Sequence, residues 1–272
     1  MSAWELHNTP GGWCTEAIST SANPVRRPLG WSMTVQEHDL IAVGGGTAGL
    51  VSAAGAAYLG ARLALVERAA LGGACLWTGC VPSKALLASA RLAHTMRHAD
   101  SLGLKGSPPT QVFCSVMERM REARATVAHH DDPERFRSMG VDVQFGTARF
   151  VGADTLDGGG VATLRSKRII VATGARPVIP PIPGLEEAAY QTHETIFDLQ
   201  THPQRVGILG GGPIGLEFSQ VFNRLGSEVV VFEMLDRILP SEDLDVAEAL
   251  LGILRHEGIS IELGARVVLG RA

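Results

Sequence analysis

The sequence predicts an α/β fold, and three observations support this prediction. A short apolar strand at residues 38–43 is followed by a glycine-rich turn and an alanine-rich helix that runs to Leu59. A second strand then ends at an acid, and the same order of strand, turn, helix, strand and acid returns at residues 206–233. In both copies the first glycine precedes the acid by 23 positions. The repeat predicts two Rossmann-like dinucleotide-binding units, the second of which is incomplete within the 272 residues.

Each residue of this repeated pattern has an expected role in holding a dinucleotide. In the first unit, Gly44 makes the tight turn, Gly46 lets the backbone approach a pyrophosphate, and Gly49 allows close packing of helix on strand. Glu67 ends the second strand, where an acid binds a ribose hydroxyl. The alternative is a glycine-rich packing turn with no ligand. The corresponding residues of the second unit are Gly210, Gly212, Gly215 and Glu233.

Two cysteines five positions apart predict a redox-active dithiol at the start of a helix. In an ideal helix, Cys75 and Cys80 would lie roughly 8–9 Å apart at Cα, which is outside the range that a disulfide tolerates. The backbone between them must therefore distort, and Gly79 permits this, while Pro82 suits a first helical turn. The helix start and the cation of Lys84 favour the thiolate, which is the reactive form.

Other interpretations of these segments are less favoured. A tetrahedral zinc site needs four closely spaced ligands, and the remaining cysteines, Cys14 and Cys114, stand alone, so no metal site is expected. An inert buried pair would not need the neighbouring glycines and proline. The uncharged run 40–61 is long enough to span a bilayer, but its six glycines and its change of period predict buried strand, turn and helix instead.

Composition and charge exclude several classes of protein. A net charge of −4 with scattered basic residues gives no nucleic-acid footprint, so no nucleic-acid partner is expected. Four cysteines in 272 residues do not form a disulfide framework, which favours a reducing cytoplasm and one catalytic pair. Residues 1–35 are rich in Ser, Thr, Pro and Gly without periodicity and are predicted to be a disordered extension.

The segment Gly72-Gly-x-Cys75-x4-Cys80-Val-Pro-Ser-Lys84 resembles the redox-active segment of the flavin-dependent pyridine nucleotide–disulfide oxidoreductases. This family includes dihydrolipoamide dehydrogenase, glutathione reductase and mercuric reductase, and the likeness covers residues 37–272. It implies FAD in the first unit and NAD(P)H in the second. Glu233 favours NAD(H) over NADP(H), because an acid there binds the ribose diol and repels a 2′-phosphate.

The resemblance also implies roles for individual side chains. Cys80 corresponds to the thiol closest to the flavin, and Cys75 to the interchange thiol that attacks substrate. Lys84 corresponds to the lysine at the reactive edge of the flavin, with Glu217 of the second unit as its carboxylate partner. A surface helix charge is the alternative interpretation of Glu217.

Three further residues are implied near the flavin by the same resemblance. Ala148 matches the segment whose backbone meets the FAD adenine, and Thr173 and Gly174 match a turn beside the flavin. Short strands between residues 141 and 171 predict a small β-meander. We therefore expect an FAD-binding domain over residues 36–183 and a partial NAD(P)-binding domain over residues 184–272, joined at a proline-rich link.

The expected activity is electron transfer between NAD(P)H, FAD and a Cys75–Cys80 disulfide, ending on a small disulfide or a metal ion. The resemblance implies homodimers that form through a C-terminal interface domain, and neither that domain nor a second flavin-contacting segment is expected within these 272 residues. The alternative is therefore a truncated dinucleotide-binding fragment that does not turn over. No membrane partner is expected.

Overall fold

The computed structural model describes residues 3–9, 12–18, 35–107, 109–110, 113–159 and 162–268. Contacts divide the chain into two compact units, residues 1–34 and 35–272. Within residues 1–34, strands β1 (Ala3–Thr9) and β2 (Gly12–Ile18) pair antiparallel. The disordered extension expected over residues 1–35 stays a prediction, because most of these residues lie outside the described part.

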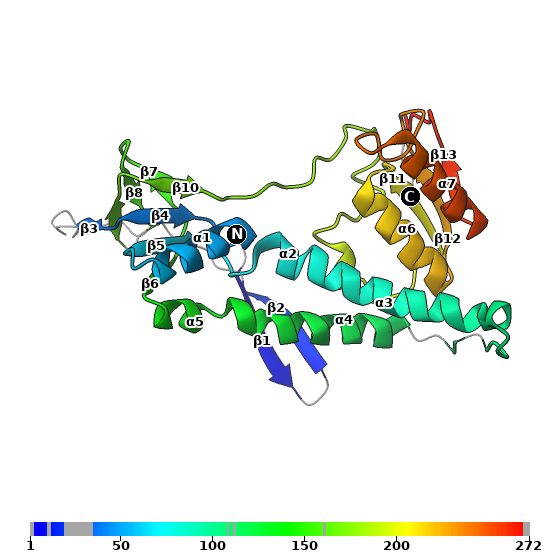
Figure 1. The fold of residues 1–272 in the computed structure, drawn as a ribbon, viewed down its shortest axis with the longest axis horizontal. Helices are drawn as coiled ribbons and strands as arrows, with labels where there is room; N and C mark the ends of the chain where they lie inside the picture. The colour runs from blue at the N-terminus through cyan, green and yellow to red at the C-terminus, as the bar shows by residue number, and fades with distance from the viewer. Residues whose placement is uncertain are drawn as a thin grey trace. The chain divides into compact units, whose positions relative to one another are not determined.

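A parallel sheet of four strands in the order β10-β4-β5-β6 forms the centre of the first predicted dinucleotide unit (Figure 1). Its strands are β4 (Leu40–Val43), β5 (Leu63–Glu67), β6 (Val141–Phe145) and β10 (Ile169–Val171). Helix α1 (Thr47–Tyr58) connects β4 to β5. Both faces of this sheet are covered, which favours continuous apolar strands. The central strands accordingly have fully buried residues on both faces, namely Ile41, Ala42, Ala64 and Leu65. This confirms the predicted strand, turn, helix and strand.

A mostly helical segment separates β5 from β6 in the sequence. It contains α2 (Gly73–Trp77), α3 (Cys80–Arg97), the 3₁₀ turn η1 (Ala99–Leu102), α4 (Phe113–Ala128), η2 (His129–Asp131) and α5 (Pro133–Ser138). The two long helices, α3 and α4, lie side by side in Figure 1. Met117 and Met120 of α4 are buried in the core, where their flexible side chains fill space between the helices.

The predicted β-meander is smaller than expected. In the described part of residues 141–171, antiparallel pairing joins β7 (Arg149–Phe150) to β8 (Thr155–Asp157) and β8 to β9 (Thr163–Arg165), and β3 (Val35–Glu37) adds to β9 in parallel. The first and last strands of the range assigned to the meander, β6 and β10, belong instead to the parallel sheet. Short apolar strands give no sequence signal that separates these two arrangements.

The second predicted unit is a parallel sheet in the order β11-β12-β13. Its elements are η3 (Ile196–Asp198), β11 (Arg205–Leu209), α6 (Pro213–Leu225), β12 (Glu228–Phe232), α7 (Leu244–His256) and β13 (Ser260–Glu262). One hydrophobic cluster contains buried residues of α3, α4, α6 and this sheet, including Leu86, Met117, Phe222 and Val231. Packing of α3 against α6 brings the cysteine-bearing helix to the second unit.

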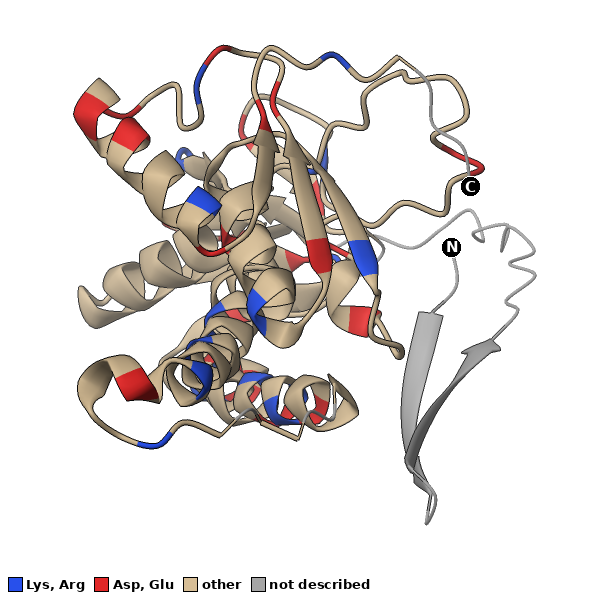
Figure 2. Ribbon diagram, turned by 90° about the vertical axis from the view of Figure 1, so that its right-hand side faces the viewer, with Lys and Arg blue, Asp and Glu red and all other residues tan. Residues whose placement is uncertain are grey.

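Charged residues are mixed over the described part of the chain. Figure 2 shows acidic and basic residues interspersed along the helices and loops on the face in view. No long basic stripe is visible there, in agreement with a net charge of −4. Each helix of the described residues is too short or too polar to cross a lipid bilayer.

Candidate active site

The first glycine loop has the close contacts that the fingerprint predicts. Gly44 has a φ of +108°, and a Cβ there would lie 2.2 Å from the carbonyl oxygen of Ala172. A Cβ on Gly49 would lie 1.8 Å from the oxygen of Gly44, so helix α1 packs on the loop at glycine distance. Gly46 is the N-cap of α1 and brings no side-chain cap. The first amides of α1 therefore have no side-chain acceptor at the cap, which suits an anionic ligand.

Glu67 lies at the end of β5, as predicted, and its carboxylate binds the backbone of its own loops. Its Oε2 accepts the N–H of Gly45 at 2.6 Å, and its Oε1 accepts the N–H of Ala69 at 2.8 Å. These two bonds fix the acid beside the glycine loop, on the side of the sheet where the strands end.

The second glycine loop repeats this arrangement atom for atom. Glu233 accepts the N–H of Gly211 at 2.6 Å through Oε2 and the N–H of Leu235 at 2.8 Å through Oε1. Gly210 again has a φ of +108°, and a Cβ on Gly215 would lie 2.3 Å from the oxygen of Gly210. The two units therefore share hydrogen bonds as well as sequence spacing.

A cavity of about 580 Å³ opens at this second loop. Glu233 and Gly210 line it together with Phe232, Arg266 and the proline-rich link at residues 180–183. Gly212, the N-cap of α6, faces open space, since a Cβ there would meet no atom within 4 Å. The carboxyl end of this sheet therefore has both an open cavity and an uncovered helix start, which fits a dinucleotide.

Thr173, Gly174 and Ala148 reach the same end of the first sheet. The backbone nitrogen of Thr173 is 3.1 Å from the position of a Cβ on Gly44, and Gly174 has a φ of +70°. Ala148 is half-buried and lies two residues beyond Gly146, whose N–H donates to the carbonyl of Glu67 at 2.8 Å. The two segments that hold these residues thus lie beside the first glycine loop and its acid, Glu67.

The two-cysteine segment is joined directly to this loop. Gly72 donates its N–H to the carbonyl of Gly45 at 2.8 Å. Gly73 has a φ of +57°, and a Cβ there would lie 2.5 Å from the Cα of Gly46. Helix α2 therefore begins against the loop that would hold the pyrophosphate.

The backbone breaks between the cysteines as the spacing predicts. Cys75 lies in α2, which ends at Trp77, and Cys80 is the first residue of α3. A Cβ on Gly79 would lie 2.7 Å from the oxygen of Ala74, so only glycine fits at the break. Both cysteines are free thiols, Cys75 half-buried and Cys80 exposed.

The two thiols interact with each other. The side-chain contact with Cys80 raises the pKa of Cys75, and burial raises it further. A hydrogen bond from Thr47 acts in the opposite direction on the pKa of Cys75 and is too weak to cancel these effects. Thr47 occupies a variable position of the glycine pattern, so no sequence signal connects it with the dithiol.

Lys84 and Glu217 form an ion pair across 133 positions of sequence. Lys84 lies one turn after Cys80 on α3, and Glu217 lies in the early part of α6. The contact between Lys84 and Glu217 implied by the resemblance is therefore present, while the role of the pair at the flavin stays a prediction. The pair joins the dithiol helix to the second glycine unit.

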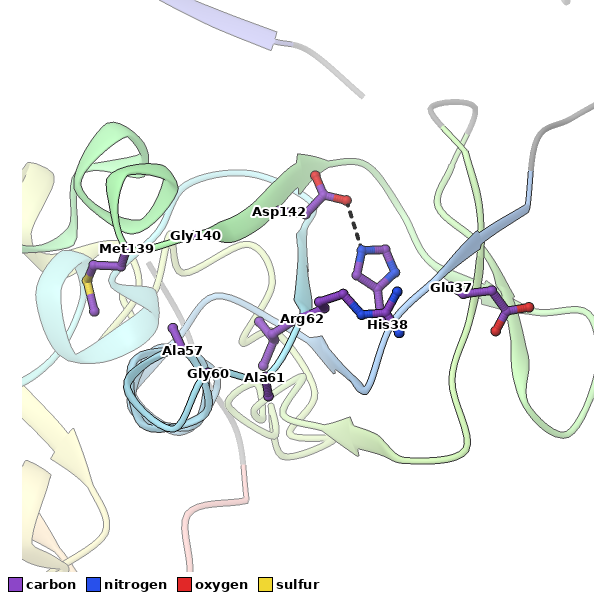
Figure 3. Close-up of a pocket in the computed structure, with 10 residues that line it drawn as sticks. Glu37, His38, Ala57, Gly60, Ala61, Arg62, Met139, Gly140 and Asp142 are labelled. Carbon is purple, nitrogen blue, oxygen red and sulfur yellow. Dashed lines mark ion pairs between the residues drawn. The ribbon is translucent and has the colours of Figure 1, made fainter.

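A second recess, of about 460 Å³, lies at the opposite end of the first sheet (Figure 3). His38 Nε2 lies 3.3 Å from Asp142 Oδ2 there, and Arg62 pairs with Asp39 beside it. The recess lies where β4, β5 and β6 begin, so it is distinct from the glycine loop at their other end.

No group of His, Cys, Asp and Glu in the described residues has a geometry that could hold a metal ion.

Comparisons with known proteins agree with this geometry. A family profile described as "Pyridine nucleotide-disulphide oxidoreductase" matches residues 38–271. A dihydrolipoyl dehydrogenase of Acholeplasma laidlawii is 36% identical over 236 residues, which are 85% of this chain and 70% of that protein. A mercuric reductase of Lysinibacillus sphaericus is 33% identical over 84% of this chain and 42% of its own length.

A solved structure has the same fold. The Cu(II) complex of the HOCl-induced flavoprotein disulfide reductase RclA from Escherichia coli superposes with a TM-score of 0.71 at 29% identity, over 85% of this chain and 50% of RclA. The chain thus spans about half the length of several relatives that it matches. With the family profile covering almost all of residues 35–272, the chain belongs to the pyridine nucleotide-disulphide oxidoreductase family.

Proposed function

We propose that this chain is the dinucleotide-binding and dithiol-bearing part of a flavoprotein oxidoreductase that reduces a small disulfide or a metal ion with NAD(P)H, or runs in reverse. One observation carries the proposal. The interacting thiols of Cys75 and Cys80 lie on a segment hydrogen-bonded to the first glycine loop, through Gly72 and Gly45.

FAD fits the first unit. Bound there, it would supply two-electron transfer between nicotinamide and the Cys75–Cys80 disulfide. The uncapped start of α1 at Gly46 would hold the pyrophosphate, and Glu67 would bind the ribose. The backbone at Ala148 would meet the adenine, and the turn at Thr173 and Gly174 would lie beside the flavin, as the family resemblance implies.

The cysteines would divide the work of thiol–disulfide exchange. The thiolate of Cys75 attacks one sulfur of a substrate disulfide, which forms a mixed disulfide and releases the first thiol. Cys80 then attacks the sulfur of Cys75 and releases the second thiol, so that the substrate gains two electrons and the protein disulfide closes. Cys80 is the first residue of α3 and is exposed, so its sulfur is accessible for this second step.

Lys84 and Glu217 would orient the two cofactors relative to each other. The ion pair fixes the Lys84 ammonium next to the dithiol helix, where the family resemblance assigns it to the reactive edge of the flavin. Glu217 comes from the helix that starts at the second glycine loop. The pair therefore connects the flavin and nicotinamide units.

We propose NAD(H) as the nicotinamide cofactor. The carboxylate of Glu233 ends β12 and lies at the cavity of the second loop, where it would bind a ribose diol and repel a 2′-phosphate. The guanidinium of Arg237 donates to the carbonyl of Pro240, so it is engaged within its own loop. This contact leaves the Arg237 guanidinium less free to attract a 2′-phosphate.

The complete enzyme is proposed to be a cytoplasmic homodimer divided near residue 183 into its two cofactor domains. The cytoplasmic proposal is supported by cysteine usage, because four cysteines in 272 residues do not form a disulfide framework. The names of the relatives support either a dihydrolipoyl substrate or mercuric ion.

The test uses the 272-residue chain incubated with FAD and then oxidised. Bound flavin is released and identified by chromatography, and peptide mapping after alkylation reports a Cys75–Cys80 disulfide. Anaerobic NADH should restore both thiols in the wild type, and the matched control Cys114→Ser should behave the same way. A chain that binds FAD yet never forms the Cys75–Cys80 disulfide would show that the pair is structural.

A further inference from the structure

A tryptophan and an arginine brace the two-cysteine segment. Trp77 lies between the cysteines and ends α2. Its indole Nε1–H donates to the carbonyl of Leu71 at 2.8 Å, which spans the short helix from end to beginning. From α4, Arg124 donates through Nη1 to the carbonyl of Trp77 at 3.2 Å, and its guanidinium carbon lies 5.7 Å from the centre of the indole ring. Trp77 is thus held by three contacts, two to its side chain and one to its backbone carbonyl.

These contacts satisfy groups that the broken helix would otherwise leave without partners. The last carbonyls of a helix have no intrahelical donor, and Trp77 supplies such a carbonyl. Burial lowers the pKa of the Arg124 guanidinium, with Asp198 opposing this effect. A half-buried guanidinium needs acceptors, and the Trp77 carbonyl is one of them.

The contacts made by Trp77 and Arg124, here called the brace, extend to the first glycine loop. Leu71, whose carbonyl receives the indole N–H, is buried, and its side chain occupies the space beside Gly45. Gly72, the next residue, donates to the Gly45 carbonyl. Contacts therefore run without a gap from α4 through Trp77 to the loop proposed to hold FAD.

We infer that Trp77 and Arg124 are positioning residues that hold the Cys75 and Cys80 thiols together and so favour disulfide formation. The inference rests on the proposed function of the pair. Ring closure requires the two Cα atoms to come within roughly 4.4–6.8 Å. The backbone break that allows this follows Trp77 directly, at Thr78 and Gly79. When Trp77 is fixed, closing the disulfide costs less conformational entropy. The effective concentration of the Cys75 thiol at the Cys80 thiol is therefore higher.

The equilibrium that reports this effect is exchange with glutathione. Two protein thiols lose two electrons and two protons as the Cys75–Cys80 bond forms. Oxidised glutathione accepts them as its own S–S bond breaks, giving two glutathione thiols. Loss of the brace should lower the equilibrium constant for closure about tenfold, which raises the reduction potential by about 30 mV.

The experiment compares variants of the 272-residue chain. Arg124→Met removes the guanidinium, and Trp77→Phe keeps the ring but removes the indole donor to Leu71. Arg119→Met is the matched control, because Arg119 lies on the same helix and donates at 3.4 Å to Ala85 of α3, outside the braced segment. Each protein is equilibrated in glutathione buffers of known ratio and quenched with acid. Alkylated and disulfide-linked peptides are then counted by mass spectrometry.

The outcomes separate this inference from the proposed function. We expect both brace variants to close about tenfold less readily, Arg119→Met to match the wild type, and Arg124→Lys to recover part of the loss, because it keeps the charge and one donor. The inference would be overturned if the brace variants are folded, as judged by circular dichroism, and their equilibrium constants for disulfide closure lie within twofold of that of the wild type. If Arg124→Met does not fold, Trp77→Phe and Arg124→Lys decide the result. A wild type that never closes the disulfide would overturn the proposed function and this inference with it.

Discussion

Replacing Gly73 with alanine tests whether the dithiol segment is seated on the first glycine loop. Gly73 has a φ of +57°, and an added Cβ would lie 2.5 Å from the Cα of Gly46. Two costs are expected. An alanine in the left-handed region loses roughly 1–2 kcal/mol of stability. The overlap lies against backbone, which cannot rotate away, and adds roughly 1–3 kcal/mol as for an overpacked core.

Gly103 is the matched control, because it isolates the second cost. Its φ of +76° imposes a similar strain, but a Cβ there would meet no atom within 4 Å. In urea-induced unfolding, Gly103→Ala should lose about 1–2 kcal/mol in free energy of unfolding, and Gly73→Ala about 2–5 kcal/mol. Gly73→Ala should also weaken FAD binding, since the loop must move. Equal losses in the two variants, with unchanged FAD affinity, would refute the close seating of α2 on the loop.

Three further predictions concern the thiols, a buried ion pair and the nicotinamide acid. In Cys80→Ser the pKa of Cys75 should fall, because the contact with Cys80 is the largest cause of its rise; the pH profile of iodoacetamide alkylation should shift to lower pH, and an unchanged profile would contradict the assignment. Arg224→Met should cost roughly 3–5 kcal/mol in free energy of unfolding, since Glu257 is 9% exposed and accepts two bonds from Arg224 at 2.6 and 2.8 Å. Burial raises the pKa of Glu257, but its hydrogen bond and attraction to Arg224 outweigh burial and lower the pKa below the ordinary 4.5. The wild type should therefore keep the stability that this ion pair provides above pH 4.5 and lose it as the pH falls through the lowered pKa of Glu257. The denaturation midpoint of Arg224→Met should depend less on pH in that range. Glu233→Gln should reduce the preference of the complete enzyme for NADH over NADPH in kcat/KM, because the amide does not repel a 2′-phosphate; an unchanged ratio would remove Glu233 from cofactor selection.

The parts of the fold that repeat with a fixed spacing could be predicted from the sequence. The two glycine loops and the acids at Glu67 and Glu233 are local patterns, and their turns impose distinctive residue types. The break between Cys75 and Cys80 also followed from helix geometry alone, since no regular helix brings positions five apart into contact.

Contacts between distant segments could not be predicted from local patterns. Trp77 and Arg124 lie 47 positions apart, and neither belongs to a recognisable motif. The hydrogen bonds from Glu67 to its own loops needed the three-dimensional positions of two amides. Strands β6 and β10 were assigned to the meander because a short apolar run has the same appearance in parallel and antiparallel sheets.

The hydrogen bond from Gly72 to Gly45 also limits how the chain can change in length. Residues 68–71 connect Glu67, which binds Gly45 through its carboxylate, to Gly72, which binds Gly45 through its amide. Both ends of this short connection are thus tied to one residue, so an inserted or deleted position would displace either the acid or the cysteines. In the part of the chain that the structure describes, the backbone of the proline-rich link at residues 177–183 has no such double attachment to a single residue. Natural variation in length should therefore accumulate in that link, while the interval between acid and dithiol stays constant.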